Sequence, residues 1–311
     1  MTLNPTDPVQ LSVRRHGTCG AIWRLDVGDA GVGRAAWCAD RAGRGRGATR
    51  PWQAPLASLA PALDRLRRLP DWLWFAPGED AFTVSADPAR RSEIVAMMRH
   101  LLGRDVDLAI TTRGGIREAR ELVALSEAAP GRLAVKIGVF ARDGGGDAGL
   151  VGRWERGLAP TTQRLALASA LVDAGAAVTL ELGPIIPFVN DHQKGLDLLI
   201  RAASRAHVKH VAPRWIEDSQ GLLHQVEREV GRSAARMLSG WFRQPGSQAR
   251  QGGPRGINLA ARSHRRQHIH DAARDHGLAV VECRCVHHGA ASSCPIAPSR
   301  IARPQLALKL A

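Results

Sequence analysis

A regular alternation of short apolar runs and amphipathic stretches, from about residue 71 to residue 213, most constrains the fold. Between the apolar runs, apolar side chains recur at helical spacing, as in residues 87–102. Strands that are apolar almost throughout are typical of a parallel sheet buried on both faces. The sequence therefore predicts a (β/α) barrel or an open α/β sheet. The expected strands are 71–76, 106–111, 132–140, 176–187 and 208–213.

The flanking segments show weaker patterns. Residues 1–50 are rich in glycine and arginine and poorly periodic, which predicts an irregular N-terminal segment. Residues 218–276 are expected to be mostly helical, with a loop at 243–256, and 278–283 reads as a final strand before a cysteine-rich tail. Thr161 and Thr162 are candidate caps for the helix that follows them. The resulting division is 1–50, a barrel at 51–217, and a helical extension with a Cys/His-rich tail at 218–311.

The composition limits the partners. No apolar run approaches the ~18 residues of a membrane span, and the N-terminus lacks a signal-peptide pattern, so a cytoplasmic protein without membrane contact is expected. The net charge of +14 suggests an anionic partner such as nucleic acid. Only four of the 43 basic residues are lysine, and this arginine excess is also what the codon bias of a GC-rich genome produces. Both explanations of the charge stay open.

Segments that are polar or rich in glycine and proline follow several of the expected strands. In parallel α/β folds, ligands bind at these carboxyl ends of the strands. One such end contains Gly78, Glu79 and Asp80. Arg113 follows the next strand and is suited to clamping a carboxylate or phosphate. The strand at 176–187 ends in Pro184-Ile185-Ile186-Pro187, and Asn190 and Asp191 follow it closely.

Lys136 lies in the middle of an otherwise apolar strand, where a buried ammonium needs an anionic partner. Glu181, also in the middle of a strand, is the expected partner. The pair is either structural or part of a ligand site.

The order of these pieces resembles the radical S-adenosylmethionine superfamily, in its spore photoproduct lyase-like branch, also described as DNA repair photolyase-like. That branch looks like "E-P-G-A-P…R-L-x-A…L-x-x-A-G-I-x-V…P-I-I-P-G-L-N-D". The resemblance runs from about Trp72 to Pro213, just under half of the chain, and is specific between Glu155 and Asp191. The matching residues are Glu155, Gly157, Pro160, Arg164, Leu165, Ala174, Gly175, Val178, Pro184, Ile185, Ile186, Pro187, Asn190 and Asp191.

The resemblance implies a fold and two cofactors. The fold is a partial (β/α)6 TIM-type barrel, and the cofactors are a [4Fe–4S] cluster and S-adenosylmethionine, with lyase- or oxidoreductase-type radical chemistry if the protein is active. By the same resemblance, Gly78 and Glu79 lie near the methionine amine and Arg164 lies near its carboxylate. Lys136 departs from the family, which tends to have a small polar residue on that strand.

The cluster loop is mostly lost. The family holds its cluster with three cysteines in a C-x3-C-x2-C loop, and "RAAWCADRAG" resembles the end of that loop, with Cys38 in the third position. The first two positions are Gly31 and Ala35. Cys19 lies too far upstream for this spacing.

A second group of metal-ligating residues lies in the tail. It contains Cys283, Cys285 and Cys294 together with nearby histidines, and can hold zinc or an iron–sulfur cluster completed by another ligand.

Three functions remain. The first is a radical-SAM-like barrel that is non-catalytic, as a binding protein or as the partner of an active homologue. The second is an active radical enzyme whose rearranged cluster uses Cys38 and the tail cysteines. The third is a basic nucleic-acid-binding protein on this scaffold. Because fold alone does not give function, the third rests on charge and analogy.

Overall fold

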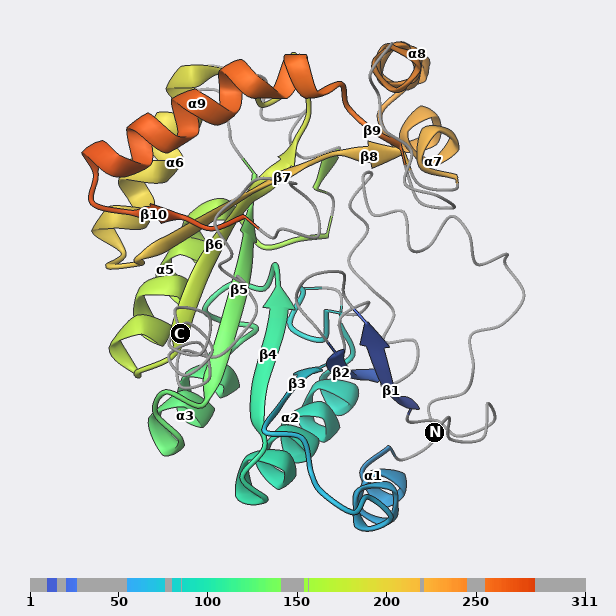
Figure 1. Ribbon diagram of the computed structural model, residues 1–311, viewed down its shortest axis with the longest axis vertical. Coiled ribbons are helices and arrows are strands. Elements are labelled where there is room, and N and C mark those ends of the chain that lie inside the picture. The colour runs from blue at the N-terminus through green and yellow to red at the C-terminus, as the bar shows by residue number, and fades with distance from the viewer. Residues whose placement is uncertain are drawn as a thin grey trace, which may run out of the picture.

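The protein is described by a computed structural model. It describes residues 10–15, 21–26, 55–75, 80–84, 86–140, 154–155, 157–218, 221–244 and 255–282. In this part of the chain, eight strands form one sheet in the order β1-β2-β3-β4-β5-β6-β7-β10 (Figure 1). Neighbouring strands from β2 to β10 are parallel, and only β1 and β2 are antiparallel. The six strands from β3 to β7 and β10 are the parallel framework of a partial barrel, as the alternating sequence pattern predicts.

The element bounds follow the expected alternation closely. The strands of the main sheet are β1 (Gln10–Arg15), β2 (Ala21–Asp26), β3 (Trp72–Phe75), β4 (Asp107–Thr112), β5 (Leu133–Val139), β6 (Ala177–Ile185), β7 (His210–Trp215) and β10 (Ala279–Val280). The helices are α1 (Pro55–Asp64), α2 (Pro88–Gly103), α3 (Arg120–Ala128), α5 (Thr161–Asp173), α6 (Gln193–Arg205), α7 (Leu222–Glu229), α8 (Arg232–Arg243) and α9 (Leu259–Asp275). A short second sheet pairs β8 (Glu217–Asp218) with β9 (Arg255–Gly256).

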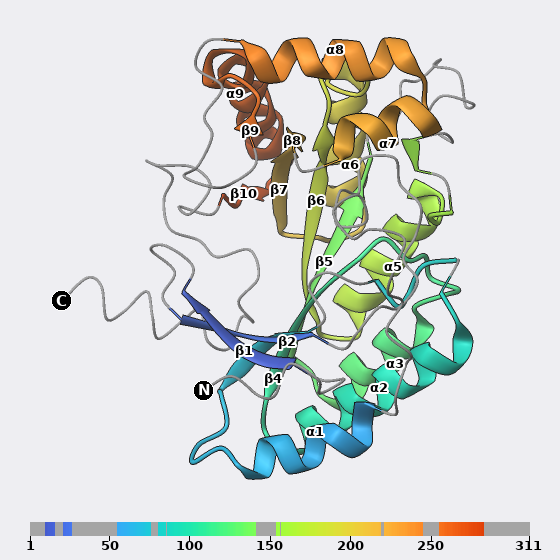
Figure 2. The ribbon, with the colours of Figure 1, turned by 90° about the vertical axis from the view of Figure 1, so that its right-hand side faces the viewer.

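One face of the sheet packs against the helices. Its side chains are large and aliphatic, for example Leu108, Val135, Leu180 and Val211, and all are buried. Helix α2 packs against β4, α5 against β5 and β6, and α9 against β7 and β10. Figure 2 shows α2, α3 and α5 together on one side of the sheet. This apolar layer supplies most of the driving force for folding, because it removes a large apolar area from water.

The other face lines the barrel interior, and its composition changes along the strands. The register aligns Trp74 with Ala109, Ala134 and Ala177 in one row across four strands. The next row, toward the carboxyl ends, joins Thr111, Lys136, Thr179 and His210, and the row after it joins Gly138, Glu181 and Ala212. Most of these residues are buried or half-buried but His210 is exposed, so the expected burial on both faces holds only in part. Apart from Trp74, the interior rows consist of small, polar and charged residues. The polar rows lie at the end of the sheet where ligands bind in such folds.

Three local expectations are wrong. Residues 10–15 and 21–26 are not irregular, because they form the antiparallel pair β1–β2, and β2 extends the parallel sheet beside β3. Thr161 is the first residue of α5 and Pro160 is its N-cap, so neither Thr161 nor Thr162 caps the helix. Residues 255–256, expected to lie in a loop, pair with β8 because the chain returns antiparallel beside it.

The C-terminal extension is not separate from the barrel sheet. Strand β10 pairs in parallel with β7, with Ala279 opposite His210. Among the helices of the described residues, none has the length and apolar character that crossing a bilayer requires.

Candidate functional site: a cationic cluster in the barrel

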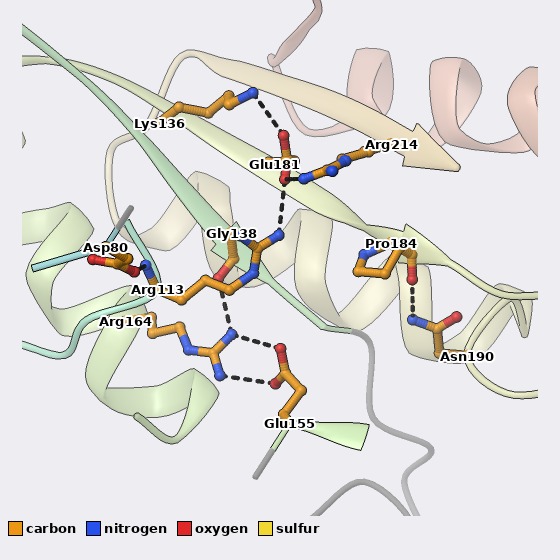
Figure 3. A network of polar contacts seen from close by, with 10 residues as sticks. All are labelled: Asp80, Arg113, Lys136, Gly138, Glu155, Arg164, Glu181, Pro184, Asn190 and Arg214. Atoms are coloured by element: carbon orange, nitrogen blue, oxygen red, sulfur yellow. Dashed lines mark hydrogen bonds and ion pairs between the residues drawn. The ribbon is translucent and has the colours of Figure 1, made fainter. Parts of the chain in front are cut away.

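Three cationic side chains converge on one carboxylate inside the barrel (Figure 3). Lys136 Nζ on β5 lies 2.7 Å from Glu181 Oε2 on β6. Arg113, just after β4, places Nη2 3.0 Å from Glu181 Oε1, and Arg214 on β7 places Nη1 3.3 Å from the same oxygen. The predicted pairing of Lys136 with Glu181 is confirmed. Among the described residues, three positive groups therefore gather around this one carboxylate.

Burial alone would raise the pKa of the Glu181 carboxyl. Lys136, Arg214 and Arg113 outweigh that effect and hold this pKa well below its usual range. Only 3% of the Glu181 side chain is exposed, whereas 51% of the Arg214 side chain is exposed. The carboxylate is therefore the buried centre of the cluster, whereas half of the Arg214 side chain lies at the surface.

Gly138 makes room for Arg113. A β-carbon on this glycine would lie 2.7 Å from Cζ of the Arg113 guanidinium, closer than real contacts of this kind. Arg113 therefore crosses β5 at a residue without a side chain and reaches Glu181 on the next strand. Burial lowers the pKa of Arg113, while the negative charge of Glu181 opposes this change.

Asp80 supports the same region through the backbone. Its carboxylate accepts hydrogen bonds from the Arg113 backbone N–H at 2.5 Å, from the Thr112 hydroxyl at 2.8 Å and from the Phe82 backbone N–H at 3.1 Å. Burial raises the pKa of Asp80 despite these hydrogen bonds. Asp80 thus fixes the chain where Arg113 leaves β4, which is a positioning role.

Arg164 and Glu155 form a second buried pair beside the cluster. Arg164 Nη1 and Nη2 donate to the two Glu155 carboxylate oxygens at 3.0 and 2.8 Å. Arg164 also donates to the carbonyl oxygens of Gly138 and Ala159, at 2.9 and 2.7 Å. Only 1% of the Arg164 side chain is exposed. Its guanidinium is therefore engaged within the protein on every nitrogen.

Pro184 and Asn190 hold the loop that follows β6. The Asn190 amide donates to the Pro184 carbonyl oxygen at 2.9 Å, and its side-chain oxygen accepts from the Ile186 backbone N–H at 2.7 Å. Figure 3 shows this pair apart from the ion cluster, joined to each other rather than to the charged residues. Their contacts hold the loop in one conformation. The binding roles predicted for Pro184 and Asn190 stay predictions.

Several predicted site residues lie outside the described residues. These are Gly78, Glu79, Cys38, Cys283, Cys285 and Cys294. Among the residues that are described, no group of three or more His, Cys, Asp or Glu side chains is arranged to hold a metal ion. Two histidines upstream of the tail lie close to carboxylates. His268 Nε2 is 2.9 Å from Asp197 Oδ1, and His270 Nε2 is 3.8 Å from Glu282 Oε2.

Arg214 is the member of the cluster that sequence reasoning missed. The fifth strand was expected to end at residue 213, whereas β7 continues to Trp215. The face alternation of that strand places Arg214 on the same side as Ala212, which is opposite Glu181. Extending the strand by two residues would have placed a third cation in the barrel interior.

Comparisons with known proteins bear on the fold of the chain. No family model and no curated protein sequence matches the chain. Two solved structures of spore photoproduct lyase variants are 12% and 14% identical, with TM-scores of 0.55 and 0.56. The first alignment covers 89% of this chain and 80% of the other, and the second covers 80% and 72%.

A third solved structure is spore photoproduct lyase in complex with dinucleoside spore photoproduct. It is 13% identical over 80% of this chain and 72% of the other, with a TM-score of 0.53. At these identities the likeness concerns the fold alone. The chain therefore has the partial α/β barrel fold of spore photoproduct lyase, which is the fold that the resemblance to the radical S-adenosylmethionine superfamily implies.

Proposed function

We propose that this chain is a radical-SAM-like barrel protein that binds an anionic ligand in its interior and does not use the family's ordinary cluster chemistry. The observation that carries the proposal is the convergence of Lys136, Arg113 and Arg214 on the single carboxylate of Glu181. Cationic side chains gathered at one place can each donate charge-assisted hydrogen bonds to an added anion. Arg214, with half of its side chain exposed, is the group that a ligand meets first.

The residues present do not fit a [4Fe–4S] cluster held in the family's way. Three thiolates are required, and Gly31 and Ala35 occupy the first two ligand positions of the loop that ends at Cys38. Neither residue has a side chain that binds iron. The ordinary cluster therefore has one of its three protein ligands.

The barrel residues also fit S-adenosylmethionine poorly. Arg164, which the resemblance assigns to the methionine carboxylate, already donates to Glu155 and to two backbone carbonyls. Sulfonium and ammonium groups are cations, and Lys136, Arg113 and Arg214 beside Glu181 disfavour their approach to this carboxylate. Both features favour a ligand whose charge is negative throughout.

Phosphate titration tests the proposal. Isothermal titration with inorganic phosphate is expected to show binding by the wild type and a loss of at least about tenfold in affinity for Lys136→Met and for Arg214→Gln, since each removes a charge-assisted contact. Arg68→Gln is the matched control, because 83% of the Arg68 side chain is exposed and it pairs with Asp71 outside the cluster. Unchanged phosphate affinity in both cluster variants would refute an interior anion site.

A rearranged cluster is the second candidate. Strand β2 runs parallel to β3 and β10 runs parallel to β7, so Asp26 and Glu282 lie toward the carboxyl-end rim of the sheet. The segments that contain Cys38 and Cys283 leave from these residues. Anaerobic iron and sulfide analysis after reconstitution separates the candidates: about four irons per chain, lost in Cys38→Ala, would support this enzyme and contradict the non-catalytic proposal.

Nucleic acid is the anionic partner with independent support. The chain carries a net charge of +14, and a protein of the same fold is known in complex with dinucleoside spore photoproduct. Phosphodiester contacts by arginine are the usual source of affinity in such proteins. Binding that weakens steeply with added salt is the expected signature.

A further inference from the structure

Phe188 combines two unusual features. It is a large apolar side chain with 69% of its surface exposed, and its backbone has a φ of 62°. This left-handed conformation is uncommon for any residue with a side chain and costs conformational free energy for a bulky one. The family pattern "P-I-I-P-G-L-N-D" has glycine at this position, which adopts such a conformation freely. The chain therefore keeps an exposed phenyl ring where glycine would be less strained.

The conformation of Phe188 is fixed by its neighbours. Its backbone N–H donates to Asp191 Oδ1 at 2.9 Å, and Asp191 Oδ2 lies 3.4 Å from Arg265 Nε on α9. Asn190 clamps the preceding residues through Pro184 and Ile186. An aromatic ring on a backbone held in this way is presented to solvent with little freedom to fold back.

A second aromatic residue stands behind the first. The rings of Phe188 and Trp241 have centroids 5.6 Å apart and planes tilted by 40°. Trp241 belongs to α8, and Figures 1 and 2 show α7 and α8 at one end of the molecule, at the opposite end from α1. Phe188 follows the carboxyl end of β6, so the two rings lie at the ligand-binding end of the sheet.

We propose that Phe188, backed by Trp241, is a stacking platform for an unpaired base of single-stranded nucleic acid, with Arg265 beside it for a neighbouring phosphate. Aromatic side chains next to cationic groups are the recurring way of binding single strands, because every base has an apolar face and every link carries a negative charge. The proposal rests on the nucleic-acid candidate above and adds a site outside the cluster around Glu181.

Charge complementarity favours nucleic acid over a protein partner or a second copy of the chain. The protein carries 43 basic residues against 29 acidic ones, so two copies repel each other while a polyanion is attracted. The two residues of the platform are also aromatic, which suits stacking against a base, whereas a groove for an apolar protein segment is usually lined by aliphatic side chains. The other large exposed apolar side chains of the described residues, Val84 and Leu198, are aliphatic.

The test measures anisotropy of a labelled oligodeoxythymidylate of about 12 nucleotides, a length within the usual site size. Phe188→Gly is expected to bind it roughly tenfold more weakly, the loss that one stacked base produces. Phe188→Tyr is expected to stay within about twofold of the wild type. Leu198→Ala is the matched control for loss of an exposed apolar group.

Two further measurements keep the proposal falsifiable. The thermal midpoint of Phe188→Gly is expected to equal or exceed that of the wild type, so weaker binding cannot be ascribed to unfolding. The salt dependence of oligonucleotide binding is expected to keep its slope in Phe188→Gly and to fall by about one in Arg265→Gln.

Several outcomes would overturn it. These are wild-type affinity in Phe188→Gly, an equal loss in Leu198→Ala, no oligonucleotide binding by the wild type, or a dimer in sedimentation velocity that Phe188→Gly abolishes. Phosphate titration of the Lys136 and Arg214 variants reports separately on the interior site. The platform can therefore fail while the interior site stands, and the reverse also holds.

Discussion

The guanidinium of Arg113 lies over the backbone of Gly138, with Cζ only 2.7 Å from the point where a β-carbon would be. This contact lets an arginine from the end of β4 reach across β5 to Glu181 on β6. The glycine is therefore a structural requirement of the ion cluster. The cluster joins β5, β6 and β7 to the loop after β4, so its loss would be felt in stability as well as in binding.

Replacing Gly138 tests this requirement. Gly138→Ala is expected to displace Arg113 and to lower the free energy of unfolding by about 1–3 kcal/mol, as overpacking in a buried region does. Gly103→Ala is the control, because a β-carbon there meets nothing within 4 Å and alanine favours the helix, so a gain of up to about 1 kcal/mol is expected. Urea unfolding measures both, and equal stabilities for the two variants would contradict the close packing.

Removing the central carboxylate leaves three cations around a neutral group. Glu181→Gln is expected to lower the free energy of unfolding by about 3 kcal/mol, since breaking a buried ion pair leaves uncompensated charge. Glu227→Gln removes an exposed partner of Arg232, with side chains 45% and 73% exposed, and is expected to cost less than about 1 kcal/mol. Urea midpoints with matched slopes decide the comparison, and similar losses in both variants would argue against a structural cluster.

The difference in unfolding free energy between the wild type and Glu181→Gln is expected to depend on pH. Because the folded-state pKa of Glu181 is lowered, its stabilising effect is fully present above the unfolded pKa of about 4.3 and is lost as the pH falls below it. The stability difference between wild type and Glu181→Gln is therefore expected to stay constant above about pH 5 and to shrink as the pH falls from there toward about pH 2, by up to about 1.4 kcal/mol per pH unit.

Asp80 does not disturb this measurement. Burial raises its pKa, so its effect has the opposite sign, and it is present in both proteins. A stability difference that stays constant through this pH range would show that Glu181 is not held ionised by its neighbours.

Removing Arg164 alone is expected to lower the free energy of unfolding, and removing Glu155 as well is expected to restore most of it. Arg164→Ala leaves the Glu155 carboxylate buried without its bidentate partner and is expected to cost about 3–5 kcal/mol. The double variant Arg164→Met with Glu155→Leu removes both charges and is expected to recover most of that loss, because a well-packed apolar pair replaces a buried ion pair at little cost. Additive losses in a double-mutant cycle would contradict the pairing.

Much of the fold could be predicted because the helix-facing side of each strand is aliphatic. Residues such as Leu108, Val135 and Leu180 made β4, β5 and β6 recognisable. Strands β1 and β2 were missed because QLSVRR and AIWRLD mix charged and apolar residues and lie in a glycine-rich context. The two-residue strands β8 and β9 carry no periodic signal at all, since their pairing is decided by the path of the chain.

The site was only partly predictable for a different physical reason. Lys136 and Glu181 were paired from sequence because a charge in the middle of an apolar strand requires a counter-charge. Arg164 was expected at a cofactor, yet its partner Glu155 lies nine residues before it and the bidentate contact depends on how the chain turns into α5. The left-handed backbone of Phe188 has no sequence signal in a phenylalanine, although the glycine in the family pattern points to it.

The pairing of β10 with β7 has a consequence for synthesis on the ribosome. Strand β7 ends at Trp215 and its partner begins at Ala279, so one edge of the sheet stays open while the intervening helical stretch is made. An open parallel edge is a template for pairing with other chains. Nascent chains that stall before residue 279 should therefore aggregate, whereas chains that reach Glu282 have the last strand needed to protect that edge.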